Sequence, residues 1–392
     1  MSSRPGYGTG PSRTALAVGL GILLGLGGVG LAINFSARDP APPPPTCLGS
    51  DSGVADRSAP HGAFVLDPPN GPHNAYYSDV QSYLLRNPAV CGADYWVAWS
   101  SVTNGTAGHL TYNFSAVDAH AASWIAAGKE VNLVFQIFSG PSDYVPGSLL
   151  SEIPTVQCGN SAVTPVEWNG TFETAYRGFI ATAVHHFETE PGFGYLRFDL
   201  GVPGELAPVS DIDAPGCQSE LASDGFSLAS WANYLDGMLS FEHSLDPTIQ
   251  LLVPISPVFP GEGDNISATV SKLAASDGIG LGTEGLRMNE SAAADPDGVG
   301  CREDVWCQQF SMYQGEVPLQ VQTTAASSPN GSGPVGSLPS LLTVGLTVHA
   351  QIFELYLDDW LTAFDPNYPP YAEYHVQYAA ALNSLASVVG TY

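Results

Sequence analysis

Short apolar segments alternate with longer amphipathic segments through most of this chain. From residue 62 onward, each apolar segment has the length and the β-branched, aromatic composition of a strand. Each is followed by a stretch with the spacing of an amphipathic helix. The apolar segments lie at 62–69, 94–102, 131–138, 194–202, 249–258, 278–286, 317–324 and 351–360.

Strand–helix units repeated in this way predict an α/β protein with a (β/α)8 TIM barrel, which needs eight of them. Right-handed crossovers close such a chain without knots. The apolar segments lack a polar face, as expected for strands that are covered on both sides. We therefore expect residues 61–392 to form one barrel domain, with its catalytic groups at one end.

The chain before residue 61 differs in composition from the predicted barrel. Residues 15–33 carry no charge and follow Arg4 and Arg13, so a transmembrane anchor is expected within 14–35. A cleaved signal peptide is the alternative. Both interpretations export the rest of the chain, with residues 1–13 cytoplasmic in the anchored form. The run ARDPAPPPPT indicates a stiff linker over 36–60, so a cell-surface or extracellular location is expected.

Sequons and cysteines agree with export. N-x-S/T sequons begin at Asn34, Asn104, Asn113, Asn169, Asn265, Asn289 and Asn330. The six cysteines form no CxxC pair, which disfavours a zinc knuckle and favours disulfides outside the cell. We expect the pairs Cys158–Cys217, Cys301–Cys307 and Cys47–Cys91.

The long connections follow strands rather than helices. They cover 103–113, 139–170, 203–225 and 287–303. In a barrel such connections meet at the C-terminal face, where active sites are built. The formal net charge of −27 repels phosphate backbones, so nucleic acid is excluded as a partner.

The segment FDLGVPGEL places Glu205 just after the fourth predicted strand. Its neighbours are apolar residues, glycine and proline. An apolar setting keeps a carboxyl protonated, as a proton donor requires. The alternative is a solvated loop carboxylate.

Three segments resemble a known family. YLRFDLGVPGEL resembles the fourth strand of clan A glycoside hydrolases, whose acid/base glutamate follows that strand, and YWVAWSSV resembles their second strand. IFELYLDDWLTAFDP is similar to the eighth strand of bacterial and archaeal β-galactosidase-like barrels. The resemblance covers about residues 62–390 and implies a retaining mechanism, in which a second carboxylate at the end of strand seven is the nucleophile.

The seventh predicted strand departs from that pattern. It reads VPLQVQTT, with Gln320 and Gln322 where the family has a glutamate. Glutamine cannot form a glycosyl ester, so either the second carboxylate lies elsewhere or the protein binds sugar without cleaving it. Glu284, Glu354 and Asp199 are the alternatives for that group. Their separation from Glu205 would distinguish retention from inversion.

Further residues are candidates for substrate contact. Trp99 and Trp360 lie near predicted strand ends, where an indole could stack on a sugar, and Gln320 and Gln322 could bind its hydroxyls. Arg197 lies within a strand and needs a buried partner, for which Asp199 or Glu354 is expected. Glu284 could instead pair with Arg287.

The sequence thus favours an extracellular glycoside hydrolase acting on a carbohydrate through Glu205 and a second carboxylate, Glu284 or Glu354, with neither metal nor organic cofactor. The alternative is a surface glycan-binding or envelope glycoprotein that keeps the barrel without turnover.

Overall fold

The computed structural model describes residues 60–67, 81–139, 142–159, 163–202, 205–209, 212, 214–258, 264–287, 305–328, 335–365, 368 and 372–389. The chain divides into two units at residue 43, and every one of these residues belongs to the second, Pro44–Tyr392. The predicted anchor and linker therefore lie outside the described residues. Within the ranges just given, no helix is both long enough and apolar enough to cross a bilayer.

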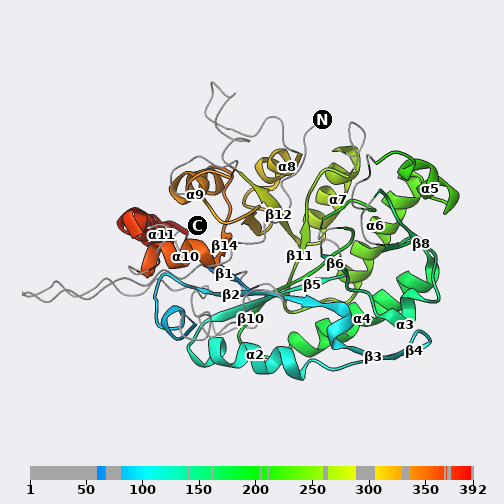
Figure 1. The fold of residues 1–392 in the computed structure, drawn as a ribbon, viewed down its shortest axis with the longest axis horizontal. Helices are drawn as coiled ribbons and strands as arrows, with labels where there is room; N and C mark the ends of the chain where they lie inside the picture. The colour runs from blue at the N-terminus through cyan, green and yellow to red at the C-terminus, as the bar shows by residue number, and fades with distance from the viewer. Residues whose placement is uncertain are drawn as a thin grey trace, which may run out of the picture. The chain divides into compact units, whose positions relative to one another are not determined.

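Eight parallel strands close into a barrel, which confirms the predicted fold. Each strand pairs with its neighbours in chain order, and the last pairs with the first (Figure 1). Every strand overlaps one of the predicted apolar segments. The strands are β1 (Gly62–Asp67), β2 (Gly92–Ala98), β5 (Glu130–Gln136), β10 (Phe193–Phe198), β11 (Gln250–Pro254), β12 (Gly280–Leu286), β13 (Leu319–Thr323) and β14 (Ile352–Tyr356).

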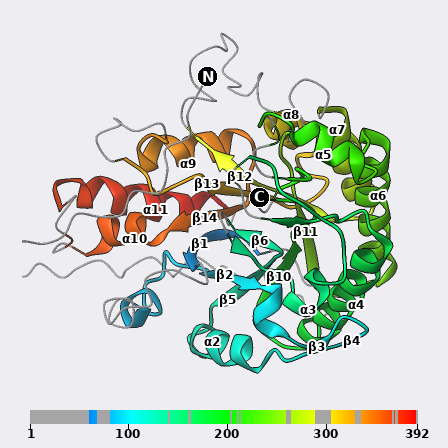
Figure 2. The ribbon, with the colours of Figure 1, turned by 45° about the vertical axis from the view of Figure 1, so that its right-hand side comes forward.

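Helices cover the outside of the barrel, with α4, α6 and α7 along one side and α9, α10 and α11 along another (Figures 1 and 2). Local signals fix some of their starts. The Asn169 side chain accepts hydrogen bonds from the first turn of α4, and Ser227 forms a capping box with Ser230 in α6. The helices are α2 (Ser115–Ala126), α4 (Gly170–Phe187), α6 (Leu228–Ser244), α7 (Asp264–Ser276), α8 (Val305–Tyr313), α9 (Leu338–Thr347), α10 (Leu357–Phe364) and α11 (His375–Val389).

The core has two layers. The larger lies between strands and helices and includes a cluster of aromatic rings around α4. The smaller lies inside the barrel, where Phe64, Val134, Tyr195, Leu252 and Ile352 pack together. Side chains of paired parallel strands face the same way, so these residues identify the inward-facing positions of every strand.

The connections that follow strands carry extra elements, as expected for the C-terminal face. The hairpin β3 (Thr103–Thr106) and β4 (His109–Tyr112) follows β2. The connection after β5 contains short strand pairs and the turn α3 (Gly147–Leu150), and α5 (Cys217–Ser223) follows β10. Most of the long connection expected at 287–303 lies outside the described residues.

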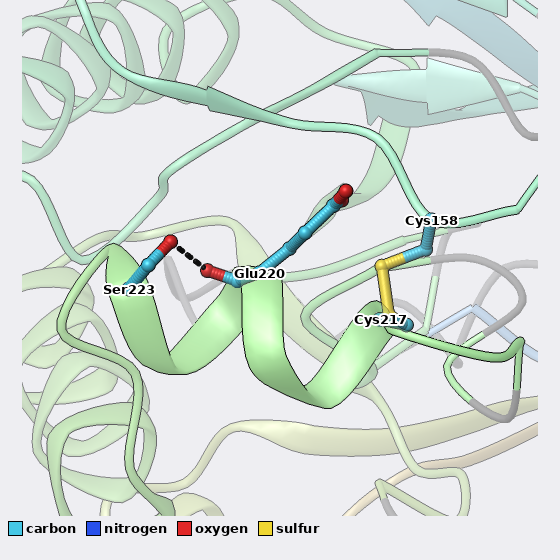
Figure 3. Close-up of a disulfide and its surroundings, with 4 residues drawn as sticks. All are labelled: Cys158, Cys217, Glu220 and Ser223. Carbon is cyan, nitrogen blue, oxygen red and sulfur yellow. Dashed lines mark hydrogen bonds between the residues drawn. A yellow bond between two sulfur atoms is a disulfide. The ribbon is translucent and has the colours of Figure 1, made fainter.

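One disulfide joins two of these connections. Cys158, after β5, is bonded to Cys217 at the start of α5, with the Cα atoms 4.8 Å apart (Figure 3). This confirms the pair predicted from the sequence. The bond links two connections through cysteines that are 59 residues apart in the chain. Cys91 and Cys307 are also disulfide-bonded. The predicted pairs Cys47–Cys91 and Cys301–Cys307 each include a cysteine outside the described residues.

Candidate functional site

The inside of the barrel is unusually polar for a buried layer. Charged and amide side chains project from most of the strands and are shielded almost completely from solvent. Such groups are costly to bury unless they are paired or hydrogen-bonded, so they indicate a site rather than simple packing. They are Asp94, Asn132, Gln136, Arg197, Asp199, Gln320, Gln322 and Glu354.

Arg197 is the centre of this layer. It lies near the end of β10 with no exposed surface, and its Nη2 forms an ion pair with Glu284 Oε1. Surrounding carboxyl groups raise the pKa of its guanidinium, in opposition to burial. The expected partners Asp199 and Glu354 contribute to this field, but the ion pair itself is with Glu284. The prediction that Arg197 needs a buried acidic partner is confirmed, and the partner is a different one.

Glu284 lies near the carboxyl end of β12, and its side chain keeps 15% of its surface exposed. Burial raises its pKa to about 7, the Arg197 charge opposes the rise, and the Glu205 charge adds to it. The effect of the Glu205 charge on Glu284 indicates that the two carboxyls lie at the same end of the barrel.

Glu205 is held by a tight turn. Val202 and Ala207 form an antiparallel bridge around it, with the Val202 N–H donating to the Ala207 carbonyl at 2.7 Å. Gly201 makes the turn possible, because a Cβ there would lie 2.6 Å from the Ala207 carbonyl oxygen. This turn leaves the Glu205 side chain partly exposed.

Leu206, next to Glu205, anchors the turn to the protein. Its N–H donates to Ser256 Oγ at 3.0 Å, and its carbonyl accepts from Trp231 Nε1 at 2.9 Å. Its side chain has no exposed surface. Glu205 therefore stands on a fixed backbone rather than on a free loop, as a group that must meet a reacting atom requires.

Asp199 is the third carboxyl at this end of the barrel. It directly follows β10 and is fully buried. Burial raises its pKa well above the usual value, Arg197 opposes the rise, and Glu284 and Glu205 add to it. We call Asp199, Glu205 and Glu284 the barrel-mouth carboxyls. Their mutual repulsion favours keeping at least one of them protonated near neutral pH.

Deeper in the barrel, Glu354 and Asp94 meet across Tyr195. The Tyr195 hydroxyl lies 2.9 Å from Asp94 Oδ1 and also contacts Glu354 Oε1. Burial raises the pKa of both carboxyls. Glu354 therefore faces the barrel interior as predicted, and its carboxyl contacts both Tyr195 and Asp94.

Gln320 and Gln322 occupy inward positions on β13, beside β12 and β14. Gly282 of β12 makes room for the first, since a Cβ there would lie 2.3 Å from Gln320 Oε1. Among the described residues, no hydrogen-bond partner reaches either polar atom of the Gln320 amide, Oε1 of Gln322, or Nε and Nη1 of Arg197. Buried groups of this kind need partners, which sugar hydroxyls could supply.

The two predicted sugar-stacking residues lie elsewhere. Trp99 belongs to the 3-10 turn η1 (Trp99–Val102), and its ring packs between Phe172 and Phe179 of α4, outside the strands. Trp360, on α10, stacks on Phe364 with the ring centroids 6.1 Å apart. Both are completely buried. Their packing is that of core residues, so we do not assign them to the site.

Two residues of this interior, Asp94 and Tyr195, were not singled out in the sequence. A signal was present, because a charged residue inside a strand that is otherwise apolar needs a buried partner. In the described part of the chain, no group of three or more His, Cys, Asp or Glu side chains is arranged to hold a metal ion.

Comparisons with known proteins find structural similarity but no sequence match. No protein-family model matches the chain, and no curated protein matches its sequence. The GH42 β-galactosidase Gan42B is similar in structure with a TM-score of 0.50 and 10% identity, over 84% of this chain and 57% of that one.

Two further solved structures have slightly lower scores. A β-amylase catalytic domain from Paenibacillus polymyxa gives a TM-score of 0.49 at 12% identity, over 75% of this chain and 91% of that one. A thermostable xylanase mutant from Cellvibrio japonicus gives a TM-score of 0.48 at 12% identity, over 83% of this chain and 97% of that one. The structural similarity is to the TIM barrels of glycoside hydrolases, including those of clan GH-A, which confirms the resemblance at the level of the fold.

Proposed function

We propose that this protein is a glycoside hydrolase that uses Glu205 as proton donor and Glu284 as second carboxylate. The observation that carries the proposal is the position of Glu284 near the carboxyl end of β12, ion-paired to the buried Arg197, with the Glu205 charge acting on it. Active sites of TIM barrels are built at that end. The shared fold with glycoside hydrolases supports the reaction class by analogy.

The reaction needs one carboxyl in each protonation state. Protonated Glu205 donates its proton to the glycosidic oxygen as the bond from that oxygen to the anomeric carbon breaks. Ionised Glu284 either attacks the anomeric carbon or takes a proton from the attacking water. Its contact with Arg197 stabilises the ionised form, and its partial exposure leaves one side open to substrate. Gln320 and Gln322 offer amide groups to sugar hydroxyls.

Glu284 fits the second role better than Glu354. Glu354 is completely buried and is engaged with Tyr195. Asp199 is also completely buried, and its pKa is raised well above the usual value, mainly by burial, so it is disfavoured as an ionised group. A carboxylate on strand six in place of strand seven distinguishes this proposal from the family pattern, in which strand seven supplies the nucleophile.

A second candidate function is glycan binding without turnover, on an exported barrel. The amides Gln320 and Gln322, on the strand that supplies the family's nucleophile, favour it. For either function we propose a location outside the cytoplasm. The disulfide Cys158–Cys217 supports that location, because disulfides persist in oxidising compartments.

Hydrolysis of a panel of aryl glycosides by the full chain tests the proposal. We expect activity in the wild type and a loss of roughly 100-fold or more in Glu205→Gln, since general acid catalysis contributes at least that much. Glu242→Gln is the matched control, because Glu242 is a buried carboxyl on α6, outside the barrel strands.

Three outcomes decide between the candidates. Loss of activity in Glu205→Gln with retention in the control supports the hydrolase. Full activity in Glu205→Gln contradicts the assigned proton donor. Sugar binding by the wild type without release of the aryl group supports the glycan-binding alternative.

A further inference from the structure

Tyr195 connects two carboxyl groups inside the barrel with a single hydroxyl. The hydroxyl contacts Asp94 Oδ1 of β2 at 2.9 Å on one side and Glu354 Oε1 of β14 on the other. None of these three side chains has exposed surface. Trp96 Nε1 donates to the second oxygen of Asp94, Oδ2, at 3.0 Å. The four residues form one chain of contacts across the barrel.

The number of protons in this chain is limited. A tyrosine hydroxyl carries one proton and can donate it to one carboxylate only. Its contact with the other carboxyl is a hydrogen bond only if that carboxyl carries a proton and donates it to the tyrosine oxygen. Two ionised carboxylates around one hydroxyl would leave one of them facing an oxygen lone pair. One of the two carboxyls is therefore neutral.

The indole of Trp96 favours Asp94 as the ionised carboxyl. An indole N–H only donates, so Asp94 Oδ2 is an acceptor and only Oδ1 could carry a proton. A fixed donor at Oδ2 stabilises the ionised form of Asp94 more than its neutral form. Among the described residues no donor reaches Glu354 Oε2, and the direct hydrogen bond between the two carboxyls raises the pKa of Glu354 and lowers that of Asp94.

We infer that Tyr195 is a positioning residue which orders one proton, so that Glu354 donates to Tyr195 and Tyr195 donates to an ionised Asp94. The other charges do not distinguish the two carboxyls, because burial raises the pKa of both and Arg197 of β10 lowers both. Glu284 of β12 adds a negative charge near Asp94, which the Trp96 and Tyr195 donors must offset.

This proton order has a consequence for Arg197. A neutral Glu354 does not compete for the guanidinium, so the ion pair between Arg197 and Glu284 is left undisturbed. Glu284 thereby keeps the cation that favours its ionised form. Only this last step rests on the proposed function. The proton order itself is a property of the folded protein.

Infrared difference spectroscopy of the full-length protein tests the proton order without any substrate. A protonated carboxyl has a C=O stretching band that a carboxylate lacks. We expect the wild type minus Glu354→Gln spectrum at neutral pH to contain such a band. We expect the wild type minus Asp94→Asn spectrum to contain the loss of a carboxylate band instead. The reverse assignment, or no protonated band in the Glu354→Gln difference, overturns the inference.

Tyr195→Phe tests the contact through the wavenumber of the Glu354 C=O band, which a purely structural role of Tyr195 would not change. Without the hydroxyl oxygen as acceptor, the Glu354 band should persist and shift to higher wavenumber, as expected for a carboxyl that loses its hydrogen bond. An unshifted band contradicts the contact. Should Tyr195→Phe fail to fold, the two amide variants still decide the assignment.

The two amide variants should also differ in stability. A glutamine at 354 can donate to Tyr195 as a neutral acid does, so Glu354→Gln should unfold at nearly the wild-type temperature. An asparagine at 94 must turn its NH2 group toward a donor, so Asp94→Asn should unfold at a lower temperature. The opposite order would assign the proton to Asp94. If the wild-type protein has no glycosidase activity, the proposed function is contradicted, but the assignment of the proton to Glu354 is not affected.

Discussion

Two buried carboxyl groups in this protein have similarly raised pKa values and very different surroundings. Burial raises the pKa of Glu284, at the barrel mouth, to about 7 and that of Glu242, in α6, to about 8. Glu284 is partly exposed and contacts Arg197. Glu242 is 1% exposed, and no ion pair to it occurs among the described residues. A raised pKa alone therefore does not define a site.

The difference lies in access and in the partner. Glu284 belongs to a strand whose carboxyl end opens toward the connections, and a second carboxyl, Glu205, acts on it. Glu242 lies in a helix, on a side shared with Tyr234, whose hydroxyl has no hydrogen-bond partner within the described structure. Glu284 is placed to exchange a proton with a bound substrate, whereas the protonation of Glu242 changes the free energy of unfolding.

Removal of the buried cation should have the largest effect. Arg197→Met removes the positive charge that pairs with Glu284, and breaking a buried ion pair costs about 3–5 kcal/mol in the free energy of unfolding. The loss should be greatest at neutral and alkaline pH. It should shrink in acid, because Arg197 lowers the pKa of these carboxyls and protonation removes their need for it. Denaturant unfolding at several pH values measures this.

Arg177→Met is the matched control. Arg177, on α4, pairs with Glu173 at 3.4 Å, and its side chain is 36% exposed. Exposed pairs of this kind contribute at most about 1 kcal/mol. Equal losses in the two variants would contradict the view that the barrel interior depends on its cation.

The pH dependence of the proposed hydrolysis should follow Glu284. The group acts in its ionised form, and its pKa is about 7, so kcat/KM should rise as the pH increases through about 7. Below that value the rate should fall by up to tenfold per pH unit. A rate that instead decreases as the pH passes about 7 would exchange the roles of Glu205 and Glu284. Initial-rate measurements across this range decide the matter.

The barrel could be predicted from sequence because its signal is repeated. Each strand is a short apolar run with a helix pattern after it, and eight such units match the count of a (β/α)8 barrel. The position of Glu205 followed from the same count, since it lies in the connection after the fourth strand. The pair Cys158–Cys217 was expected as a bond between two connections, and the structure contains it.

Side-chain direction was harder to predict. Along β2 the inward positions alternate through Asp94, Trp96 and Ala98, so Trp99 faces the helices. The sequence does not show which residues of the strand face inward, because both faces of the strand are apolar. The partner of Arg197 also stayed open, since the depth of Glu284 and Glu354 in the barrel depends on the stagger between strands rather than on spacing along the chain.

The smallest expected effect compares the two glutamates directly by the same substitution. Glu242→Gln should not change stability at a pH below about 4.5, where the carboxyl is neutral in both folded and unfolded chains. The folded pKa is raised, so the wild type loses stability as the pH rises toward about 8 and the unfolded chain ionises first. Glutamine does not ionise, so the variant should be more stable than the wild type above that pH.

Glu284→Gln should have the same sign but a smaller size at the same pH, because the pKa of Glu284 is raised only to about 7 and the Arg197 charge opposes the rise. Urea unfolding of both variants at acidic and alkaline pH measures the difference. An equal gain in stability in the two variants would mean that Arg197 does not reduce the cost of ionising Glu284. The contrast between a helix-layer carboxyl without an ion pair and a barrel-mouth carboxyl held by a cation would then be lost.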